Sequence, residues 1–209
     1  IRDQPRSRGL GDVYKRQDMS AIVTLKKGEG RTIKAGGAWI FDNEIDTITG
    51  RFKNGEVVTV HDFDGYPMGK GFINQNSKIR IRMMTRKPDQ EIDEAFLKMR
   101  VKNAWEYRKT TVDTSSCRII FGEADFLPGL VIDKYEDVLV VECLALGMEQ
   151  FKEIIVNFLK EILAEDGIKS RGVYERSDAN ERTKEGLSKV KGFIGDAFDT
   201  NVELSLIHI

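Results

Sequence analysis

Cysteine, histidine and proline are scarce in this chain, which has two, two and four of them among 209 residues. Cys117 and Cys143 stand apart, without the short spacing of a CxxC or metal-ligand motif. The sequence therefore predicts neither a disulfide scaffold nor a zinc site, and two isolated thiols are typical of a protein kept reduced in the cytosol. His61 lies beside Asp62 on a strand-like segment. A single histidine in that setting is more often structural or solvated than a ligand or a base.

Charge of one sign and long hydrophobic runs are also lacking. The formal net charge is -1, so the chain lacks the overall positive field of a protein that coats nucleic acid. Any RNA contact must come from a local basic face. No apolar run approaches the ~20 residues that span a bilayer, and the residues after Met19 lack the charged and apolar regions of a signal peptide. These absences predict a cytoplasmic protein with no membrane partner, and the length allows one or two domains.

The two ends of the chain carry related hexapeptides. DVYKRQ, residues 12–17, and LSLIHI, residues 204–209, can be encoded by one DNA string and its reverse complement. A sequencing adapter translated at both ends explains this relation better than chance does. We therefore interpret residues 1–17 and 204–209 as adapter-derived, exclude them from fold reasoning, and expect the natural start at Met19.

Residues 21–86 alternate short strand-like segments with turn residues, and the clearest of these segments are 22–25, 57–62 and 79–83. Asp64 and Gly65 predict a hairpin turn, because both tolerate a positive φ. Gly69 and Gly71 predict a bulge or tight bend in the returning strand. The segment as a whole is typical of a small β-barrel.

Residues 88–109 change to a helical period. Ile92, Phe96, Val101, Ala104 and Trp105 recur at near-helical spacing. Acidic residues fall in the first turns, where they complement the positive end of the helix dipole. We predict one helix that joins two domains and packs its apolar stripe into a core.

The remaining pattern is strands, helix, strand. The predicted strands are residues 117–121, 130–134, 138–144 and 172–175. A predicted helix covers 148–163, and a short second helix covers 180–184, with Ser177 or Asp178 as its N-cap and Gly186 at its end. This order predicts an α+β fold.

A basic stripe follows one of the predicted strands. Lys78, Arg80 and Arg82 alternate with Ile79, Ile81 and Met83, so a strand would turn the cations to one face and the apolar side chains to the core. Cations that could extend the stripe are Lys26, Lys27, Arg31 and Lys34. Such a face can bind phosphates without reading sequence. An ordinary solvated strand face explains the same pattern, because Lys and Arg are the usual outward residues.

Four motifs carry a family resemblance. They are KGEGRTIKAGGAWIFDNEI (27–45), GKGFINQNSKIRIRMM (69–84), FGEADFLPGLVIDKY (121–135) and YERSDANERTKEGL (174–187). Together they resemble the S-adenosylmethionine-dependent enzymes that methylate carbon five of a cytosine in large-subunit ribosomal RNA. Members of that family carry His-Pro before the tryptophan, whereas this chain has Gly37 and Ala38. A role for that histidine is therefore not carried over.

The resemblance implies a PUA-like RNA-binding β-barrel over residues 18–88, a linking helix over 89–110 and a middle domain of the strand-strand-helix-strand (EEHEE) type over 111–203. It implies ribosomal RNA as the partner. It favours RNA contact by Lys27, Arg31, Lys34, Lys78, Arg80 and Arg82. In the full-length family member a C-terminal catalytic domain uses S-adenosylmethionine. The full-length protein could also form a homodimer. This chain is expected to stop before that domain and to bind no cofactor.

Two charged groups invite a functional interpretation. Glu123 and Asp125 could bind a metal or divide acid and base roles, but we favour a turn in which both acids cap the backbone or contact water. Residues 176–185 hold charges of both signs. Arg176 could reach a phosphate, but we interpret the segment as a short helix with exposed salt bridges, each worth ~0.2–1 kcal/mol.

The chemistry of methyl transfer has no counterpart in the pattern. A class I site needs a glycine-rich loop between a strand and a helix, and methylation at carbon five needs a cysteine nucleophile. Gly28-Glu-Gly30 and Gly69-Lys-Gly71 lie among predicted strands, and neither cysteine belongs to such a site. We therefore assign no catalytic, cofactor-binding or metal-binding residue.

Three classes of function remain open. The chain could be the RNA-recognition portion of a truncated methyltransferase, a complete non-catalytic RNA-binding protein with a PUA domain, or a protein-interaction barrel. The adjoining source DNA separates the first two, because an open frame leading into a glycine-rich strand-loop-helix supports the first and a stop codon the second. Salt-dependent RNA binding is expected for both and not for the third.

Overall fold

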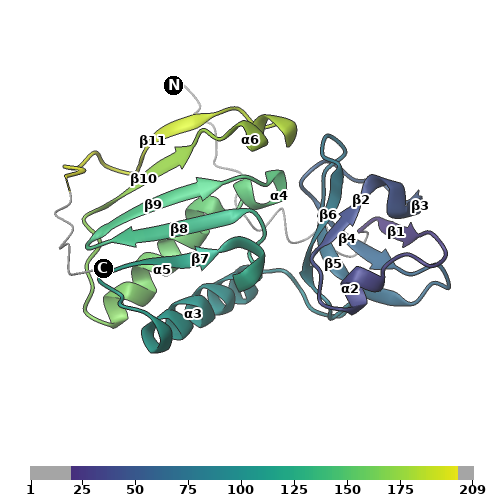
Figure 1. The fold of residues 1–209 in the computed structure, drawn as a ribbon, viewed down its shortest axis with the longest axis horizontal. Coiled ribbons are helices and arrows are strands. Elements are labelled where there is room, and N and C mark those ends of the chain that lie inside the picture. Colours follow the sequence, from purple (N-terminus) through teal and green to yellow (C-terminus); the bar gives the residue numbers. More distant parts are fainter. Residues whose placement is uncertain (1–19, 202–209) are drawn as a thin grey trace, which may run out of the picture.

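The computed structural model describes residues 20–201. Met19 and the hexapeptides that we interpret as adapter-derived lie outside the described residues. Figure 1 shows two lobes side by side. The first lobe holds the elements of residues 22–85, and the second lobe holds those of residues 94–194. Its two sheets and few helices make the fold α+β, as the sequence predicts.

A curled six-stranded sheet forms the first lobe. Its elements are β1 (Ile22–Leu25), α2 (Arg31–Lys34), β2 (Trp39–Phe41), η2 (Asp42–Glu44), β3 (Ile45–Thr49), β4 (Val57–His61), β5 (Pro67–Ile73) and β6 (Ile79–Thr85). The strand order is β2-β6-β5-β4-β1-β3. Only the β1–β4 pair is parallel among the strand pairs of this sheet. Val23, Leu25, Ile40, Val58 and Ile81 are fully buried in its core.

The predicted hairpin and bulge are both present. Strands β4 and β5 pair antiparallel across a turn in which Gly65 has a φ of 84°. Gly69 has a φ of 139°, and a Cβ there would lie 2.1 Å from the carbonyl oxygen of Thr85. The register shifts between Lys70 and Gly71. Glycine is required here because the backbones of β5 and β6 approach too closely for any side chain.

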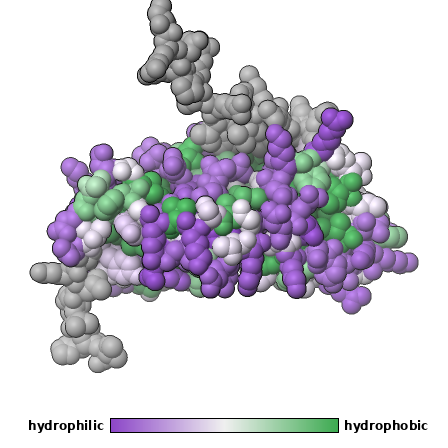
Figure 2. All heavy atoms as spheres, turned by 90° about the horizontal axis from the view of Figure 1, so that it is seen from above, coloured by the Kyte–Doolittle hydropathy of each residue, from purple (hydrophilic) through white to green (hydrophobic). Residues whose placement is uncertain are grey.

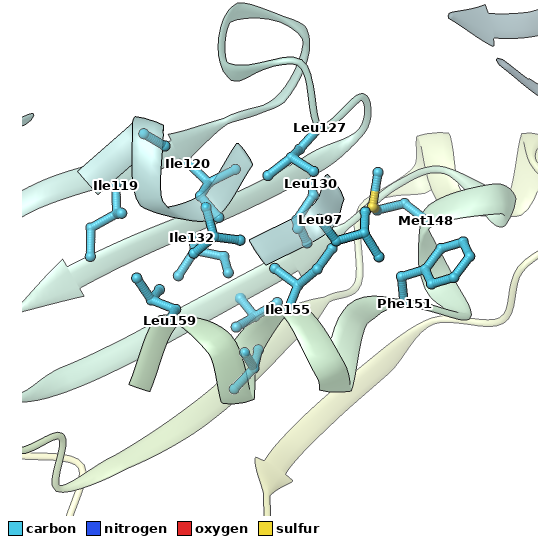
Figure 3. Close-up of a cluster of buried hydrophobic side chains, with 14 of the residues drawn as sticks. Leu97, Ile119, Ile120, Leu127, Leu130, Ile132, Met148, Phe151, Ile155 and Leu159 are labelled. Atoms are coloured by element: carbon cyan, nitrogen blue, oxygen red, sulfur yellow. The ribbon is translucent and has the colours of Figure 1, made fainter. Parts of the chain in front are cut away.

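A five-stranded sheet with two long helices on one face forms the second lobe. Its elements are α3 (Glu94–Thr111), β7 (Ser116–Phe121), η3 (Gly122–Asp125), β8 (Leu130–Tyr135), β9 (Val138–Cys143), α4 (Leu146–Glu149), α5 (Lys152–Glu165), β10 (Gly172–Ser177), α6 (Asn180–Lys184) and β11 (Val190–Ile194). The strand order is β11-β10-β9-β8-β7. Figure 3 shows Ile155 and Leu159 of α5 facing the buried side chains of the sheet, such as Ile132.

Helix α3 belongs to this second core. The Asp93 carboxylate accepts a hydrogen bond from the Phe96 N–H at 2.8 Å, which caps the helix. Phe96, Val101 and Trp105 are buried in the cluster that also holds the apolar face of α5. The helical stripe predicted from the sequence is therefore core packing, and α3 is a layer of the second lobe as well as the connection to it. No helix within residues 20–201 is long and apolar enough to span a bilayer.

Several local expectations are wrong or incomplete. The helix expected over 148–163 is two helices, because α4 ends at Glu149 and α5 begins at Lys152. Neither Ser177 nor Asp178 caps α6, whose N-cap is Ala179 without a side-chain hydrogen bond. Strands β3 and β11 were not predicted. They are edge strands without any fully buried residue, so their sequences lack a clear apolar alternation.

The two lobes share an apolar contact. The rings of Phe72 on β5 and Phe151 lie 5.7 Å apart. Gly147 of α4 packs so closely on Phe72 that a Cβ would lie 2.2 Å from its Cγ. Gln150 donates a hydrogen bond across the same contact to the Gly55 carbonyl at 2.7 Å. On the face drawn in Figure 2, hydrophobic side chains lie in separate areas among hydrophilic ones.

Candidate nucleic-acid interface

Strand β6 turns its cations away from the core of the first lobe. Ile81 and Met83 are buried, whereas Lys78, just before the strand, is exposed and the side chains of Arg80 and Arg82 are 21% and 13% exposed. The predicted alternation is therefore present. The three cations nevertheless have different surroundings, so they are not equivalent candidates for binding phosphate.

The helical turn η2 brings the start of this stripe close to the end of β1. The Asp42 N–H donates to the carbonyl oxygen of Lys78 at 3.1 Å, and the Asp42 carboxylate lies 3.9 Å from the Arg80 guanidinium. On the other side of η2, the Lys26 ammonium donates to the Asn43 carbonyl at 2.7 Å. Lys26 and its neighbour Lys27 therefore share one end of the sheet with Lys78 and Arg80.

Helix α2 supplies the other two predicted cations. Lys34 forms an ion pair with Asp62 at 3.2 Å, next to the β4–β5 turn. The hydrogen bonds from Tyr66 and Lys34 outweigh the smaller effect of desolvation and lower the pKa of Asp62, so this carboxylate is charged at neutral pH. Among the described residues, Lys27, Arg31 and Lys78 form no ion pair. These three cations are the most available to a phosphate.

Arg82 faces the second lobe. Its guanidinium donates to the carboxylates of Glu123 and Glu185 at 3.1 Å each, and its side chain is 13% exposed. Glu185 is buried and also accepts from Ser77 Oγ at 2.6 Å and Asn74 Nδ2 at 3.0 Å. The charge of Arg82 is thus already matched by two carboxylates. Its place in the predicted RNA-binding set becomes secondary to a role in joining the lobes.

The acids of the 121–135 motif form ion pairs. The turn that we expected is present as η3, but Asp125 is buried against Arg108, whose Nη2 lies 2.5 Å from its carboxylate. Glu123 accepts from the Trp39 indole N–H at 2.7 Å as well as from Arg82. The expectation that these carboxylates cap the backbone or contact water holds in part, because Asp125 also accepts from the Phe121 N–H at 2.7 Å and the Glu123 side chain is 30% exposed. Each is engaged by an arginine that lies far away in the sequence.

The charged segment around α6 is also less exposed than predicted. Arg182 is 2% exposed and donates to both carboxylate oxygens of Glu149, at 2.8 and 2.9 Å. It donates as well to the carbonyl oxygens of Cys143 and Ser188, at 2.5 Å each. Exposed salt bridges of the kind that we expected are found at Asp178, which pairs with Arg176 and with Lys191. Arg182 is a buried anchor of the second lobe.

Glu149 gives this anchor a pH dependence. Burial opposes its ionisation, but hydrogen bonds from Arg182 and Lys152 outweigh burial and lower its pKa to about 2 from an ordinary value of 4.5. A depressed carboxyl pKa stabilises the fold fully above the ordinary value, and this contribution is lost as the pH falls from there towards 2. The free-energy advantage of the wild type over Glu149→Gln should therefore shrink by about 1–2 kcal/mol between pH 6 and pH 3. Urea unfolding at both pH values measures it, and a constant difference would contradict the ion pair.

The two GxG pairs noted in the sequence both lie in the first lobe. Gly28 and Gly30 lead only into the four-residue helix α2, and the space beside Gly30 is filled by Leu25 and Met68, each 3.0 Å from a built Cβ. The close approach at Gly69 and Gly71 is occupied by the backbone of β6. The space beside Gly30, Gly69 and Gly71 is thus filled by the first lobe itself, and we assign no S-adenosylmethionine contact to these residues.

The two thiols are buried or half-buried, and burial affects their ionisation. Burial raises the pKa of Cys143 and of Cys117, which disfavours the nucleophilic thiolate. No three His, Cys, Asp or Glu side chains between residues 20 and 201 come together as metal ligands. The candidate site is a set of cations around η2 and α2.

Exposed aromatic residues beside these cations were missed by the sequence analysis. Trp39 and Phe41 of β2 are each 41% exposed, whereas Ile40 between them is buried. The alternation of these three residues was a usable signal, because it places both rings on one face of an edge strand. The interlobe partners Asn74, Ser77 and Glu185 had no such signal.

Known proteins resemble this chain in sequence and in fold. Residues 23–86 match the family model of the PUA-like domain. Ribosomal RNA large subunit methyltransferase I from Alteromonas mediterranea is 36% identical over 179 residues, which cover 84% of this chain and 44% of the relative. The protein of the same name from Pseudoalteromonas translucida is 34% identical over 177 residues, which cover 83% of this chain and 43% of that protein.

A solved structure shares the fold. A putative S-adenosylmethionine-dependent methyltransferase from Streptococcus mutans aligns with a TM-score of 0.68 at 13% identity, over 85% of this chain and 44% of its own. The chain thus spans less than half the length of the relatives that it matches.

Proposed function

We propose that this chain is the RNA-recognition and middle portion of an S-adenosylmethionine-dependent ribosomal RNA cytosine-C5 methyltransferase, whose Rossmann-type catalytic domain lies outside these residues. The observation that carries the proposal is a PUA-like sheet with available cations at η2 and α2, in a chain whose curated relatives are named for methylation of large-subunit ribosomal RNA. The proposed domain division keeps residues 18–88 as the RNA-binding part, 89–110 as the linking helix and 111–203 as the middle domain.

The proposal extends to partners and location. The RNA partner is ribosomal RNA, the protein partner is the catalytic domain of the full-length protein, and a homodimer of that protein is open to test. The location is the cytoplasm. S-Adenosylmethionine supplies the methyl group when it is bound by the full-length protein. The residues of this chain contribute by holding RNA phosphates and by fixing the first lobe relative to the second.

Lys27, Arg31 and Lys78 are the residues best placed to hold phosphate. They are exposed and carry no ion pair among the described residues, so a phosphate meets a cation that is not already neutralised. Lys34 and Arg80 can take part after a shift away from Asp62 and Asp42. Contacts of this kind position RNA without reading its sequence. Base recognition then rests on other side chains.

The expected result for this proposal is a loss of RNA affinity when the available cations are neutralised. Replacing Lys27, Arg31 and Lys78 with glutamine should weaken binding to transcribed large-subunit ribosomal RNA by about 10- to 100-fold near 0.1 M salt, because released counterions provide much of the affinity. Fluorescence anisotropy of labelled RNA measures it. The matched control is the glutamine variant of Lys160, Lys169 and Lys184, three exposed lysines of the second lobe. Equal affinities of the two variants would contradict the proposal.

A further inference from the structure

Trp39 is an exposed tryptophan on an edge strand. Its neighbour Ile40 is fully buried and anchors β2 in the core of the first lobe, while Trp39 and Phe41 turn outwards with 41% of each residue exposed. Their rings are perpendicular, with centroids 6.4 Å apart. Leaving two large rings in water forgoes the free energy of burying them. Such a pair is therefore a candidate binding surface.

The orientation of Trp39 is fixed by both lobes. The indole N–H donates to the Glu123 carboxylate at 2.7 Å, and the Arg82 guanidinium carbon lies 5.5 Å from the ring centroid. Arg82 is in turn held by Glu123 and Glu185. Because these partners are themselves ion-paired, the ring keeps one orientation before any ligand arrives. A ring that is fixed in advance loses little entropy on binding.

Cations lie next to the aromatic pair, on and just before the neighbouring strand β6. In the register of β2 and β6, Trp39 lies opposite Arg82 and Phe41 opposite Ile79. The two neighbours of Ile79 in sequence are Lys78, which has no ion pair among the described residues, and Arg80. Neighbouring strands are only ~4.8 Å apart. A ligand that fits this surface has flat rings to contact Trp39 and Phe41 and negative charges to contact the neighbouring cations. A single-stranded polynucleotide has both.

We propose that Trp39 is a stacking platform for an unpaired nucleobase of RNA, with Phe41 at its edge and Lys78 and Arg80 holding the neighbouring phosphates. The inference rests on the proposed RNA-binding function and adds a binding mode to it. Bases in an RNA duplex are stacked on one another and are not available to a protein ring, so the ligand must be a loop, bulge or single strand. Stacking is tolerant of base identity because every base has a π-face.

The chain offers a direct optical test, because its two tryptophans have opposite environments. Trp105 is 1% exposed in the core of the second lobe, whereas Trp39 is exposed. A titration with oligouridylate of about 12 nucleotides, long enough to cover one such site, should quench the Trp39 emission and leave that of Trp105. Trp39→Phe should abolish the quenching. A fully paired RNA duplex should quench much less at equal occupancy.

Affinity variants separate stacking from charge. Trp39→Leu should weaken oligouridylate binding by about tenfold, while Trp39→Phe, which keeps a ring, should lose less. The matched control is Tyr66→Leu at the β4–β5 turn, a more exposed aromatic that is not part of the pair, and its affinity should not change. Thermal unfolding of each variant shows whether Trp39→Leu is still folded. If that variant is unfolded, the wild-type quenching decides alone.

The outcomes distinguish this inference from the function on which it rests. Salt-dependent RNA binding without quenching of Trp39 would overturn the stacking platform and leave the proposed function standing. No RNA binding by anisotropy at low salt would contradict the proposed function itself. Quenching that persists with equal strength on duplex RNA would also overturn the inference, because it would show that no unpaired base is needed.

Discussion

Replacing Arg182 with methionine is expected to lower the free energy of unfolding by about 3–5 kcal/mol, because removing one partner of a buried ion pair leaves the other without compensation. In this variant Glu149 keeps only Lys152, and the carbonyl oxygens of Cys143 and Ser188 lose their donor. A loss of this size is a large fraction of the ~5–15 kcal/mol that stabilises a typical domain. Urea unfolding followed by circular dichroism measures it.

Two further variants show that geometry, and not charge alone, carries this effect. Arg182→Lys keeps the charge but loses the planar pair of hydrogen bonds, so it should recover only part of the stability. Arg176→Met removes an arginine that is 71% exposed, and it should change the free energy of unfolding by no more than about 0.5 kcal/mol. Equal losses of unfolding free energy for Arg182→Met and Arg176→Met would contradict a stabilising role for the buried Arg182–Glu149 ion pair.

The second large effect is expected at Glu185, where the lobes are joined. Glu185→Leu should lower the free energy of unfolding by about 2–4 kcal/mol. Its carboxylate accepts from Ser77, Asn74 and Arg82, all of which belong to the first lobe. The substitution leaves these buried donors with fewer acceptors, and Arg82 keeps Glu123 alone.

A double-mutant cycle measures the interaction free energy between Arg82 and Glu185 across the two lobes. Arg82→Met and Glu185→Leu should together cost less than the sum of their separate losses, because each removes the same ion pair. Glu181→Leu is the matched control, since Glu181 lies in α6, which ends next to Glu185, and is exposed. Strict additivity of the first pair would contradict a direct contact between Arg82 and Glu185.

Local patterns predicted much of each element from the sequence. The alternation of Ile81 and Met83 with Arg80 and Arg82 predicted β6 and its buried side correctly, but it did not predict that Arg82 packs against the second lobe. The helical spacing of Phe96, Val101 and Trp105 gave α3 and its buried side. These signals work because a strand or helix repeats its environment every few residues, so one buried position predicts the next.

The partners of the charged residues were not predictable in this way. Arg82 binds Glu185 across 103 residues of sequence, and Arg82 looked the same as Arg80 in the pattern of β6. Arg182 looked like part of an exposed charged helix, yet it is buried against Glu149. Such pairings depend on how the lobes pack, which no local period encodes. In the structure, Lys27, Arg31 and Lys78 are therefore the preferred candidates for RNA binding. Arg82 contacts carboxylates of the second lobe instead.

The salt dependence of RNA binding tests the central claim most directly. Neutralising Lys27, Arg31 and Lys78 should reduce the magnitude of the slope of log affinity against log salt by about 2. Each phosphate contact on single-stranded RNA contributes ~0.7 to this slope, and three contacts are lost. The glutamine variant of Lys160, Lys169 and Lys184 has the same net charge and should keep the wild-type slope. We expect a lower slope for the first-lobe variant only. Equal slopes for the two variants, or no salt dependence in the wild type, would contradict it.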